Sequence, residues 1–223
     1  MINQFFTTLV VCMISIGSLS AQKRFQQNLK EGKPQTIVVY GTSLSVSPDG
    51  WAAMLEQSLD SIYPGQIKVI NSAVGGMWST WGVQHLDERV IAHKPDLLLV
   101  EFTINDAYLP YNTSPEVCKL NIEYMIDRVL EANPECEIIL QIMNMPIGEH
   151  LAQRQNYHEY TNVYRKVAKK RKVGLIDHSV YWNDILAQGE DNFRSYAPDG
   201  IHPEKKAWEE LVTPYIMKCL LSK

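Results

Sequence analysis

The sequence predicts one α/β domain, a three-layer α/β/α sandwich around a five-stranded parallel sheet. Short apolar runs rich in β-branched residues alternate with longer amphipathic segments, a pattern typical of repeated βα units. The pairs 64–65, 94–95 and 133–134 each contain proline and stand directly before an apolar run, where they are expected to end a helix.

The strands are expected where the apolar runs are shortest and most β-branched. In chain order they are 36–40, 67–70, 96–102, 137–142 and 173–177. The run 97–100 has no polar residue, so we expect the third strand to be buried on both faces of the sheet.

The helices are expected between the strands and after the last one. They cover about 49–62, 79–93, 115–132, 149–171 and 204–220. In the first of them Trp51, Leu55, Leu59 and Ile62 recur at helical spacing, which predicts one apolar face turned toward the sheet.

Composition excludes several classes of protein. The 223 residues include 21 Lys and Arg against 25 Asp and Glu, a net charge of -4, whereas a nucleic-acid surface needs clustered excess cation. Hydrophobic residues make up 45% and charged residues 21%, which excludes a disordered chain. The length suits a single domain.

The first residues are expected to be a targeting segment. Residues 5–19 carry no charge but are fewer than the ~20 apolar residues that span a bilayer, and the small residues that follow suit signal peptidase. We expect 1–21 to be a cleaved signal peptide and 22–223 a secreted or periplasmic domain without stable membrane insertion. Lys23 and Arg24 follow the run instead of preceding it, which leaves an uncleaved anchor or a buried first helix as alternatives.

Polar and glycine-rich segments follow the predicted strands. They are 41–45 (Gly-Thr-Ser-Leu-Ser), 71–76 (Asn-Ser-Ala-Val-Gly-Gly), 103–106 (Thr-Ile-Asn-Asp) and, near the C-terminus, 199–203 (Asp-Gly-Ile-His-Pro). Ligands of open parallel sheets bind outside the carboxyl ends of the strands, so we expect these segments to meet there.

In this order, the four segments resemble the sequence blocks of the SGNH hydrolases, also called the GDSL esterase and lipase family. The resemblance covers about residues 36–205, and its most specific part is Asp-Gly-Ile-His-Pro at 199–203. It implies the flavodoxin-like fold of that family and a hydrolase that acts on carboxylic esters.

Acyl transfer needs a nucleophile, a base, a group that orients the base and donors for the oxyanion. The resemblance makes Ser43 the nucleophile and His202 the base. Asp199 lies three residues before His202 and is expected to orient its imidazole. The alternative for this segment is a plain turn ahead of a helix that starts near Pro203.

The family's oxyanion hole implies three donors in this chain. They are the backbone amide of Ser43, the backbone amide of Gly76 and the side chain of Asn105. Counting from Asn71 favours Gly76 over Gly75, and both remain possible. For Asn105 the alternative is a turn or a helix cap.

Three residues depart from the family's usual pattern: Thr42 replaces Asp, Thr103 replaces Gly, and Ala73 replaces Gly. None of these positions supplies a catalytic group. At position 42 an acid that helps to hold the nucleophile loop is absent, so we expect the threonine hydroxyl to take that role.

The substrate is expected to be a small-molecule, oligosaccharide or polysaccharide ester, with a short acyl group such as acetyl on a carbohydrate. Trp78 follows Gly76 closely and is a candidate platform for a sugar ring, its alternative being core packing. A lysophospholipase or thioesterase of the same family and a non-catalytic carbohydrate-binding relative are the other hypotheses. The oligomeric state is left open.

No metal or other cofactor is expected. The six histidines include no HExxH motif and no pair at i, i+4, and no GxGxxG or Walker A sequence follows the first strand. Four histidines on predicted helices are expected to be surface or hydrogen-bonded residues: His85, His93, His150 and His158.

Overall fold

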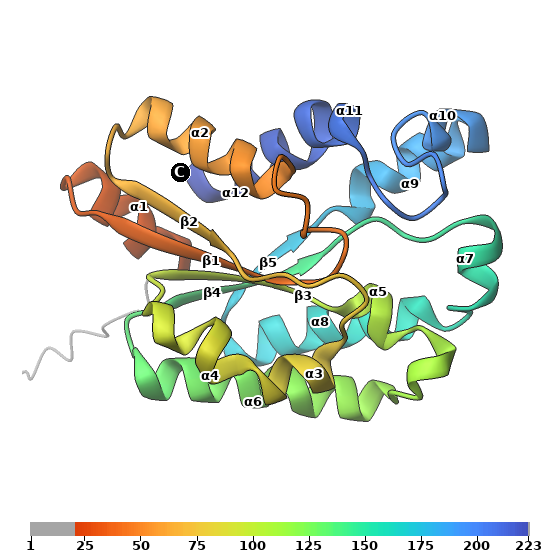
Figure 1. The fold of residues 1–223 in the computed structure, drawn as a ribbon, viewed down its shortest axis with the longest axis horizontal. Coiled ribbons are helices and arrows are strands. Elements are labelled where there is room, and N and C mark those ends of the chain that lie inside the picture. Colours follow the sequence, from red (N-terminus) through yellow and green to blue (C-terminus); the bar gives the residue numbers. More distant parts are fainter. Residues whose placement is uncertain (1–20, 223) are drawn as a thin grey trace, which may run out of the picture.

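The computed structural model describes residues 21–222 and contains the predicted five-stranded parallel sheet (Figure 1). The strands are β1 (Gln35–Gly41), β2 (Ile67–Asn71), β3 (Leu97–Glu101), β4 (Glu137–Ile142) and β5 (Gly174–Asp177). Their order is β2-β1-β3-β4-β5, and every neighbouring pair is parallel. All five carboxyl ends therefore meet at one edge, as the sequence predicted.

Helices cover both faces of the sheet, which makes the predicted three layers (Figure 1). One layer contains α1 (Ala21–Lys30), α2 (Trp51–Ile62) and α12 (Thr213–Leu221), and the other contains α3 (Ser79–Gln84), α4 (Leu86–Arg89), α6 (Pro115–Ala132) and α8 (Tyr157–Arg171). Every residue of β3 and β4 is buried, because these central strands are covered on both faces.

Three predicted helices are interrupted. The segment 79–93 divides into α3, α4 and a 3-10 turn, Ile91–His93, that ends at Lys94 in the left-handed region, φ 50°. The segment 149–171 divides into α7 (Gly148–Ala152) and α8.

The last predicted helix, 204–220, is also interrupted. Between α11 (Lys205–Ala207) and α12 lies a π-helical turn, Trp208–Val212. Pro214 stands just after this turn, and proline lacks the N–H that would continue the α-helical ladder into the preceding turn.

Several short helices were not predicted. They are α1, α5 (Thr103–Asp106), a 3-10 turn Leu109–Tyr111, α9 (Ser179–Ala187) and α10 (Glu190–Arg194). Helix α1 buries Phe25 and Leu29, and the Gln26 side-chain amide donates to the Leu220 carbonyl at 2.7 Å. Residues 1–20 lie outside the described residues, so the signal peptide 1–21 and the domain bounds 22–223 stay predictions.

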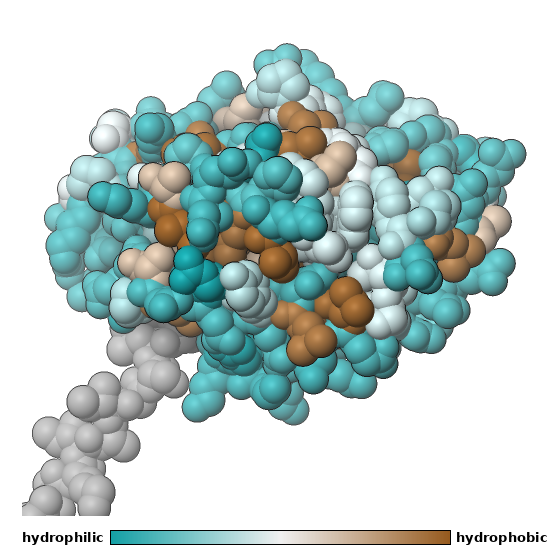
Figure 2. All heavy atoms as spheres, turned by 60° about the horizontal axis from the view of Figure 1, so that its bottom comes forward, coloured by the Kyte–Doolittle hydropathy of each residue, from teal (hydrophilic) through white to brown (hydrophobic). Residues whose placement is uncertain are grey.

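The face that contains α3 and α6 is mostly hydrophilic (Figure 2). Figure 2 brings the layer of α3 and α6 forward and shows separate apolar areas on a largely polar face. Exposed apolar side chains of α6 include Val117 and Leu120, and scattered apolar residues of this kind are ordinary on a protein surface. Within residues 21–222 no helix has the length and apolar character needed to cross a membrane.

Candidate active site

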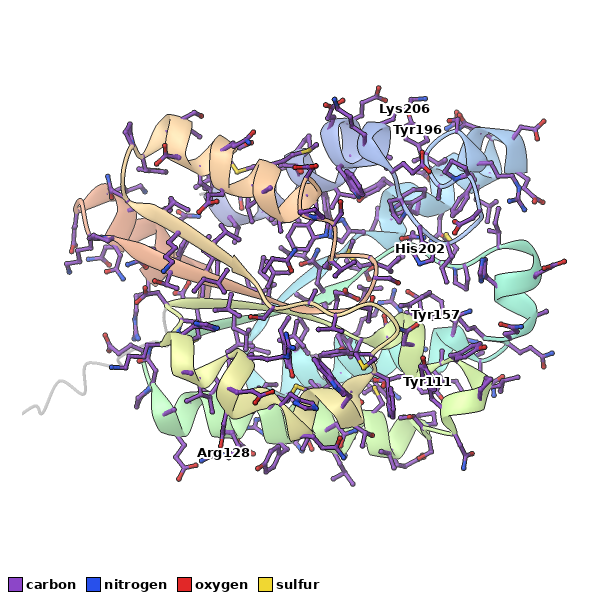
Figure 3. All side chains as sticks on the ribbon, in the orientation of Figure 1. Tyr111, Arg128, Tyr157, Tyr196, His202 and Lys206 are labelled. Carbon is purple, nitrogen blue, oxygen red and sulfur yellow. The ribbon has the colours of Figure 1, made fainter. Side chains whose placement is uncertain are left out.

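Ser43, His202 and Asp199 form one hydrogen-bonded chain at the carboxyl edge of the sheet. Ser43 follows β1, and its Oγ lies 2.9 Å from Nε2 of His202. Nδ1 of the same imidazole lies 2.6 Å from Oδ2 of Asp199. In Figure 3 His202 lies at the end of the molecule where the strands finish. The structure thus brings together the three residues that the sequence predicted for the triad.

The carboxylate of Asp199 fixes both the loop and the imidazole. Its Oδ1 accepts the backbone N–H groups of Ile201 at 2.9 Å and His202 at 2.8 Å. Partial burial opposes ionisation, but the hydrogen bonds from His202 and Ile201 outweigh it and lower the pKa of Asp199. An ionised carboxylate at Nδ1 keeps the proton there, so Nε2 is free to accept a hydrogen bond from Ser43.

Contacts from the segment after β4 hold the loop that carries His202. Ile147 N–H donates to the Gly200 carbonyl at 2.9 Å, and the Asn144 side-chain amide donates to the Ile201 carbonyl at 2.8 Å. Gly200 has φ +89°, and a Cβ there would lie 2.9 Å from Cγ1 of Ile147. This position therefore requires glycine for its backbone conformation and for space.

A buried glutamate lies beneath the loop of Ser43. Glu101 ends β3, opposite Gly41 in the register, and a Cβ on Gly41 would lie 2.3 Å from its Oε1. The carboxylate accepts Thr42 N–H at 2.6 Å and Ser45 Oγ–H at 2.8 Å. Burial raises the pKa of Glu101 to about 7, against the lowering effect of these hydrogen bonds.

The Thr42 hydroxyl donates to the same carboxylate, at 3.1 Å from Oε1 and 3.0 Å from Oε2. The sequence predicted that this hydroxyl would replace the missing acid at position 42. The prediction was incomplete, because an acid is present and comes from β3. Glu101 was recognisable as a charged residue at the end of an otherwise apolar run, 97–100.

The three predicted oxyanion donors come from the segments that follow β1, β2 and β3. Within residues 21–222 the N–H groups of Ser43 and Gly76 donate to no protein acceptor. The Asn105 side-chain amide donates one hydrogen bond, to the Met77 carbonyl at 2.8 Å, and its second N–H is not used in this contact. A Cβ on Gly75 would lie 3.9 Å from Cβ of Ser43, so both glycines stay candidates for the backbone donor.

The loops after β2 and β3 are fastened to each other. Tyr111 Oη donates to the Gly76 carbonyl at 2.6 Å, and Ser79 N–H donates to Oδ1 of Asp106 at 2.9 Å. The rings of Trp78 and Tyr111 stack with centroids 4.5 Å apart and planes 24° apart. The half-buried Trp78 is thus held by an aromatic partner instead of the central core.

Two residues beside this edge were missed. His150 lies on a helix, as predicted, but its ring centroid is 6.4 Å from that of His202, edge to face. The buried Arg154 donates from Nε to the Ile104 carbonyl at 2.7 Å, and its guanidinium lies 4.6 Å from the centroid of Tyr108. No sequence motif marks either residue; only the break between α7 and α8 brings them here.

The remaining titratable groups do not form a metal centre. Within residues 21–222 no three His, Cys, Asp or Glu side chains converge in a way that could hold an ion. His178 is buried between Nε2 of Gln141 at 3.1 Å and Oη of Tyr181 at 2.6 Å. Burial lowers the pKa of His178 to about 3, so the neutral imidazole is a hydrogen-bonded core residue.

Comparison with known proteins places this sequence in a family. The sequence model of the GDSL-like lipase/acylhydrolase family matches residues 37–207. An arylesterase of Vibrio mimicus is 26% identical over 180 residues, which cover 78% of this chain and 82% of that protein. Esterase TesA of Pseudomonas aeruginosa is 24% identical over 190 residues, which cover 82% of this chain and 87% of that protein.

Solved structures show the same fold. A catalytic mutant of Axe2, an acetylxylan esterase from Geobacillus stearothermophilus, superposes with a TM-score of 0.72 at 20% identity over 86% of this chain and 96% of that one. A lipase/acylhydrolase from Enterococcus faecalis gives 0.69 at 21% identity over 82% of this chain and 94% of that one. At these identities the likeness concerns the fold alone. The family match covers most of the chain and two curated esterases share its sequence, so this protein belongs to the GDSL-like lipase/acylhydrolase family and is a hydrolase of carboxylic esters.

Proposed function

We propose that the protein is a serine esterase that removes acetyl, or a similarly short acyl group, from a carbohydrate through the triad Ser43, His202 and Asp199. The observation that carries this proposal is the hydrogen-bond chain from Asp199 Oδ2 through the His202 ring to Ser43 Oγ. Such a chain supplies a nucleophile, its base and the group that orients the base.

The first half of the reaction acylates the enzyme. Nε2 of His202 accepts the proton of Ser43 Oγ while Oγ attacks the carbonyl carbon of the ester. The imidazolium then gives that proton to the departing alcohol, and the acyl group stays on Ser43. Asp199 remains ionised throughout and stabilises the imidazolium, consistent with its lowered pKa.

The second half returns the enzyme to its starting state. His202 takes a proton from water, and the resulting hydroxide attacks the acyl carbon. The bond between the acyl carbon and Ser43 Oγ breaks, Oγ recovers the proton from the imidazolium, and the carboxylic acid leaves. In both halves the negative oxygen is stabilised by the N–H of Ser43, the N–H of Gly76 and the Asn105 side chain. Loss of one such donor typically costs ~3 kcal/mol of transition-state stabilisation.

Three observations support the carbohydrate acetyl ester as substrate. Trp78 stacks on Tyr111 next to Gly76, and aromatic faces of this kind bind sugar rings well. The acetylxylan esterase Axe2 is among the structures with the same fold. The net charge of -4 suits a neutral polar substrate better than an anionic polymer.

The proposal extends to where the enzyme works. Residues 1–21 have the length and the small final residues of a secretory signal, so we propose export and cleavage after Ala21. N-terminal sequencing of the protein made from the full gene should read Gln-Lys-Arg from Gln22. A mature chain that retains Met1 in the membrane fraction would instead support the uncleaved anchor.

Acetate release from a panel of acetylated polysaccharides tests the substrate. The wild-type enzyme should release acetate from at least one of them, Ser43→Ala should release none, and Ser61→Ala, a change at an exposed serine of α2, should behave as wild type. A parallel series of p-nitrophenyl esters should favour acetate. Preference for octanoate would favour the lysophospholipase or thioesterase hypothesis, and carbohydrate binding without any ester turnover would favour the binding protein.

A further inference from the structure

Glu101 is a buried carboxylate whose hydrogen-bond donors all come from one short loop. The residue is only 2% exposed, and among residues 21–222 it takes part in none of the ion pairs. A buried acid without a cationic partner is costly unless hydrogen bonds satisfy its oxygens. The donors are Thr42 N–H, Thr42 Oγ1–H and Ser45 Oγ–H.

These donors lie on either side of the nucleophile in the sequence. Thr42 directly precedes Ser43, Ser45 follows two residues later, and the side chain of Ser43 is not among the groups bound to Glu101. Thr42 Oγ1 accepts the N–H of Leu44 at 3.2 Å, so its own proton is free to point at the carboxylate. The carboxylate thus fixes the backbone of residues 42–45 and leaves the hydroxyl of Ser43 to His202.

We propose that Glu101 is a positioning residue for the nucleophile: through Thr42 and Ser45 it holds Ser43 where Oγ reaches His202 and the backbone N–H faces the oxyanion. This inference rests on the proposed triad but assigns a role to a residue outside it. Small displacements of a reacting group are costly, since about 1 Å of misplacement can cost on the order of a hundredfold in rate.

The groups around Glu101 explain why its contacts to the loop matter. Asp106 of α5 carries a second buried acid that raises the pKa of Glu101 further. Burial and the charge of Glu101 both raise the pKa of Tyr157 and Tyr164 of α8. None of these groups is a cation. The loop donors of Thr42 and Ser45 are therefore the groups that stabilise the ionised form.

The hydrogen bond between positions 42 and 101 can be reversed, which gives a sharp test. In the wild type a hydroxyl at 42 donates to a carboxylate at 101. In Thr42→Asp combined with Glu101→Gln, an amide at 101 donates to a carboxylate at 42, and that carboxylate retains an acceptor for the Leu44 N–H. Thr42→Asp alone places two carboxylates in one buried site, and Glu101→Gln alone leaves an amide facing the Thr42 hydroxyl.

Hydrolysis of p-nitrophenyl acetate should show the reversal. We expect each single variant to lower kcat by about tenfold or more with KM within about twofold, because substrate binding is untouched. The double variant should recover at least about fivefold over the better single variant. Additive losses in the double variant, or a change confined to KM, would overturn the proposal.

Milder variants and a matched control separate positioning from folding. Thr42→Val and Ser45→Ala each remove one donor and should lower kcat severalfold while the circular dichroism spectrum stays native. Glu137→Gln removes another buried carboxylate, at the opposite end of the sheet, where it accepts the N–H of Arg24 at 2.9 Å. That variant should retain wild-type kcat; an equal loss in Glu137→Gln would contradict the assigned role.

Amide hydrogen exchange tests the same contact without any substrate. Glu101→Gln should speed exchange across residues 42–45 by about tenfold more than Glu137→Gln does, because the anchoring of the loop is weakened. Unchanged exchange in residues 42–45 would overturn the inference, whether or not Ser43 is the nucleophile. Full activity of Ser43→Ala would instead refute the triad, so the two failures are distinguishable.

Discussion

Nε2 of His202 and Oγ of Ser43 lie 2.9 Å apart although the two residues are 159 positions apart in the chain. Two independent loops have to be placed correctly for this contact: the loop after β1 is held by Glu101, and the loop before α11 is held by Asn144 and Ile147. The contact thus depends on residues that do no chemistry themselves.

Replacement of Asp199 should depend on what replaces it. Asp199→Asn keeps an oxygen that can accept the backbone N–H groups of Ile201 and His202. The new side-chain amide, however, can donate to Nδ1 of His202, which favours the tautomer with the proton on Nε2. A protonated Nε2 cannot accept the hydrogen bond from Ser43. We expect kcat to fall on the order of a thousandfold or more. Asp199→Ala should lower kcat less, because water can accept the hydrogen bond from Nδ1–H of His202. Steady-state kinetics on p-nitrophenyl acetate check this order, and the reverse order would contradict it.

Gly200→Ala should displace the histidine. The residue needs φ +89° and has no room for a Cβ beside Ile147, so we expect about 1–3 kcal/mol of destabilisation and loss of most activity. Gly189→Ala is the matched control, since Gly189 has φ +122° with no neighbour within 4 Å of an added Cβ. It should lose stability without losing activity. Thermal melts on both variants measure the backbone strain, and kinetics on both variants measure the displacement of His202.

Tyr111→Phe should act on catalysis more than on binding. The change removes the hydrogen bond to the Gly76 carbonyl but retains the stack on Trp78. We expect kcat to fall about tenfold with KM nearly constant, since the loop that carries an oxyanion donor is loosened. Tyr124→Phe, at an exposed position of α6, is the control. A rise in KM with unchanged kcat would contradict this prediction and would indicate that Tyr111 contributes to substrate binding.

The Glu137 carboxyl should make a contribution to stability that falls as pH rises from about 4.5 to about 7. Burial raises the pKa of Glu137 from 4.5 to about 7, so the folded state holds a proton that the unfolded state releases in this window. The resulting stabilisation is complete below pH 4.5 and is lost as pH rises through the folded pKa. Glu137→Gln should reduce this pH dependence. Melting temperatures measured from about pH 4.5 to about pH 8 check it, and a steeper decline in the variant would contradict it.

The sequence predicted the fold because the apolar runs are short and regularly separated. All five strands lie where expected, and α6 spans the predicted 115–132. The broken helices were not predicted, because π turns and tertiary contacts such as Arg154 with Ile104 leave no local pattern. At the site, local blocks marked Ser43 and His202. Glu101 and Tyr111 bind residues of other loops, and His150 lies beside His202. These contacts depend on strand order and not on sequence spacing.

Covalent labelling of the nucleophile tests the central claim most directly. Diethyl p-nitrophenyl phosphate should phosphorylate the wild-type enzyme once, and peptide mass spectrometry should locate the diethylphosphoryl group on Ser43 and not on the neighbouring Ser45. Ser43→Ala should remain unlabelled, and His202→Ala should be labelled far more slowly. Labelling at another residue, or ester hydrolysis that persists in Ser43→Ala, would contradict the account.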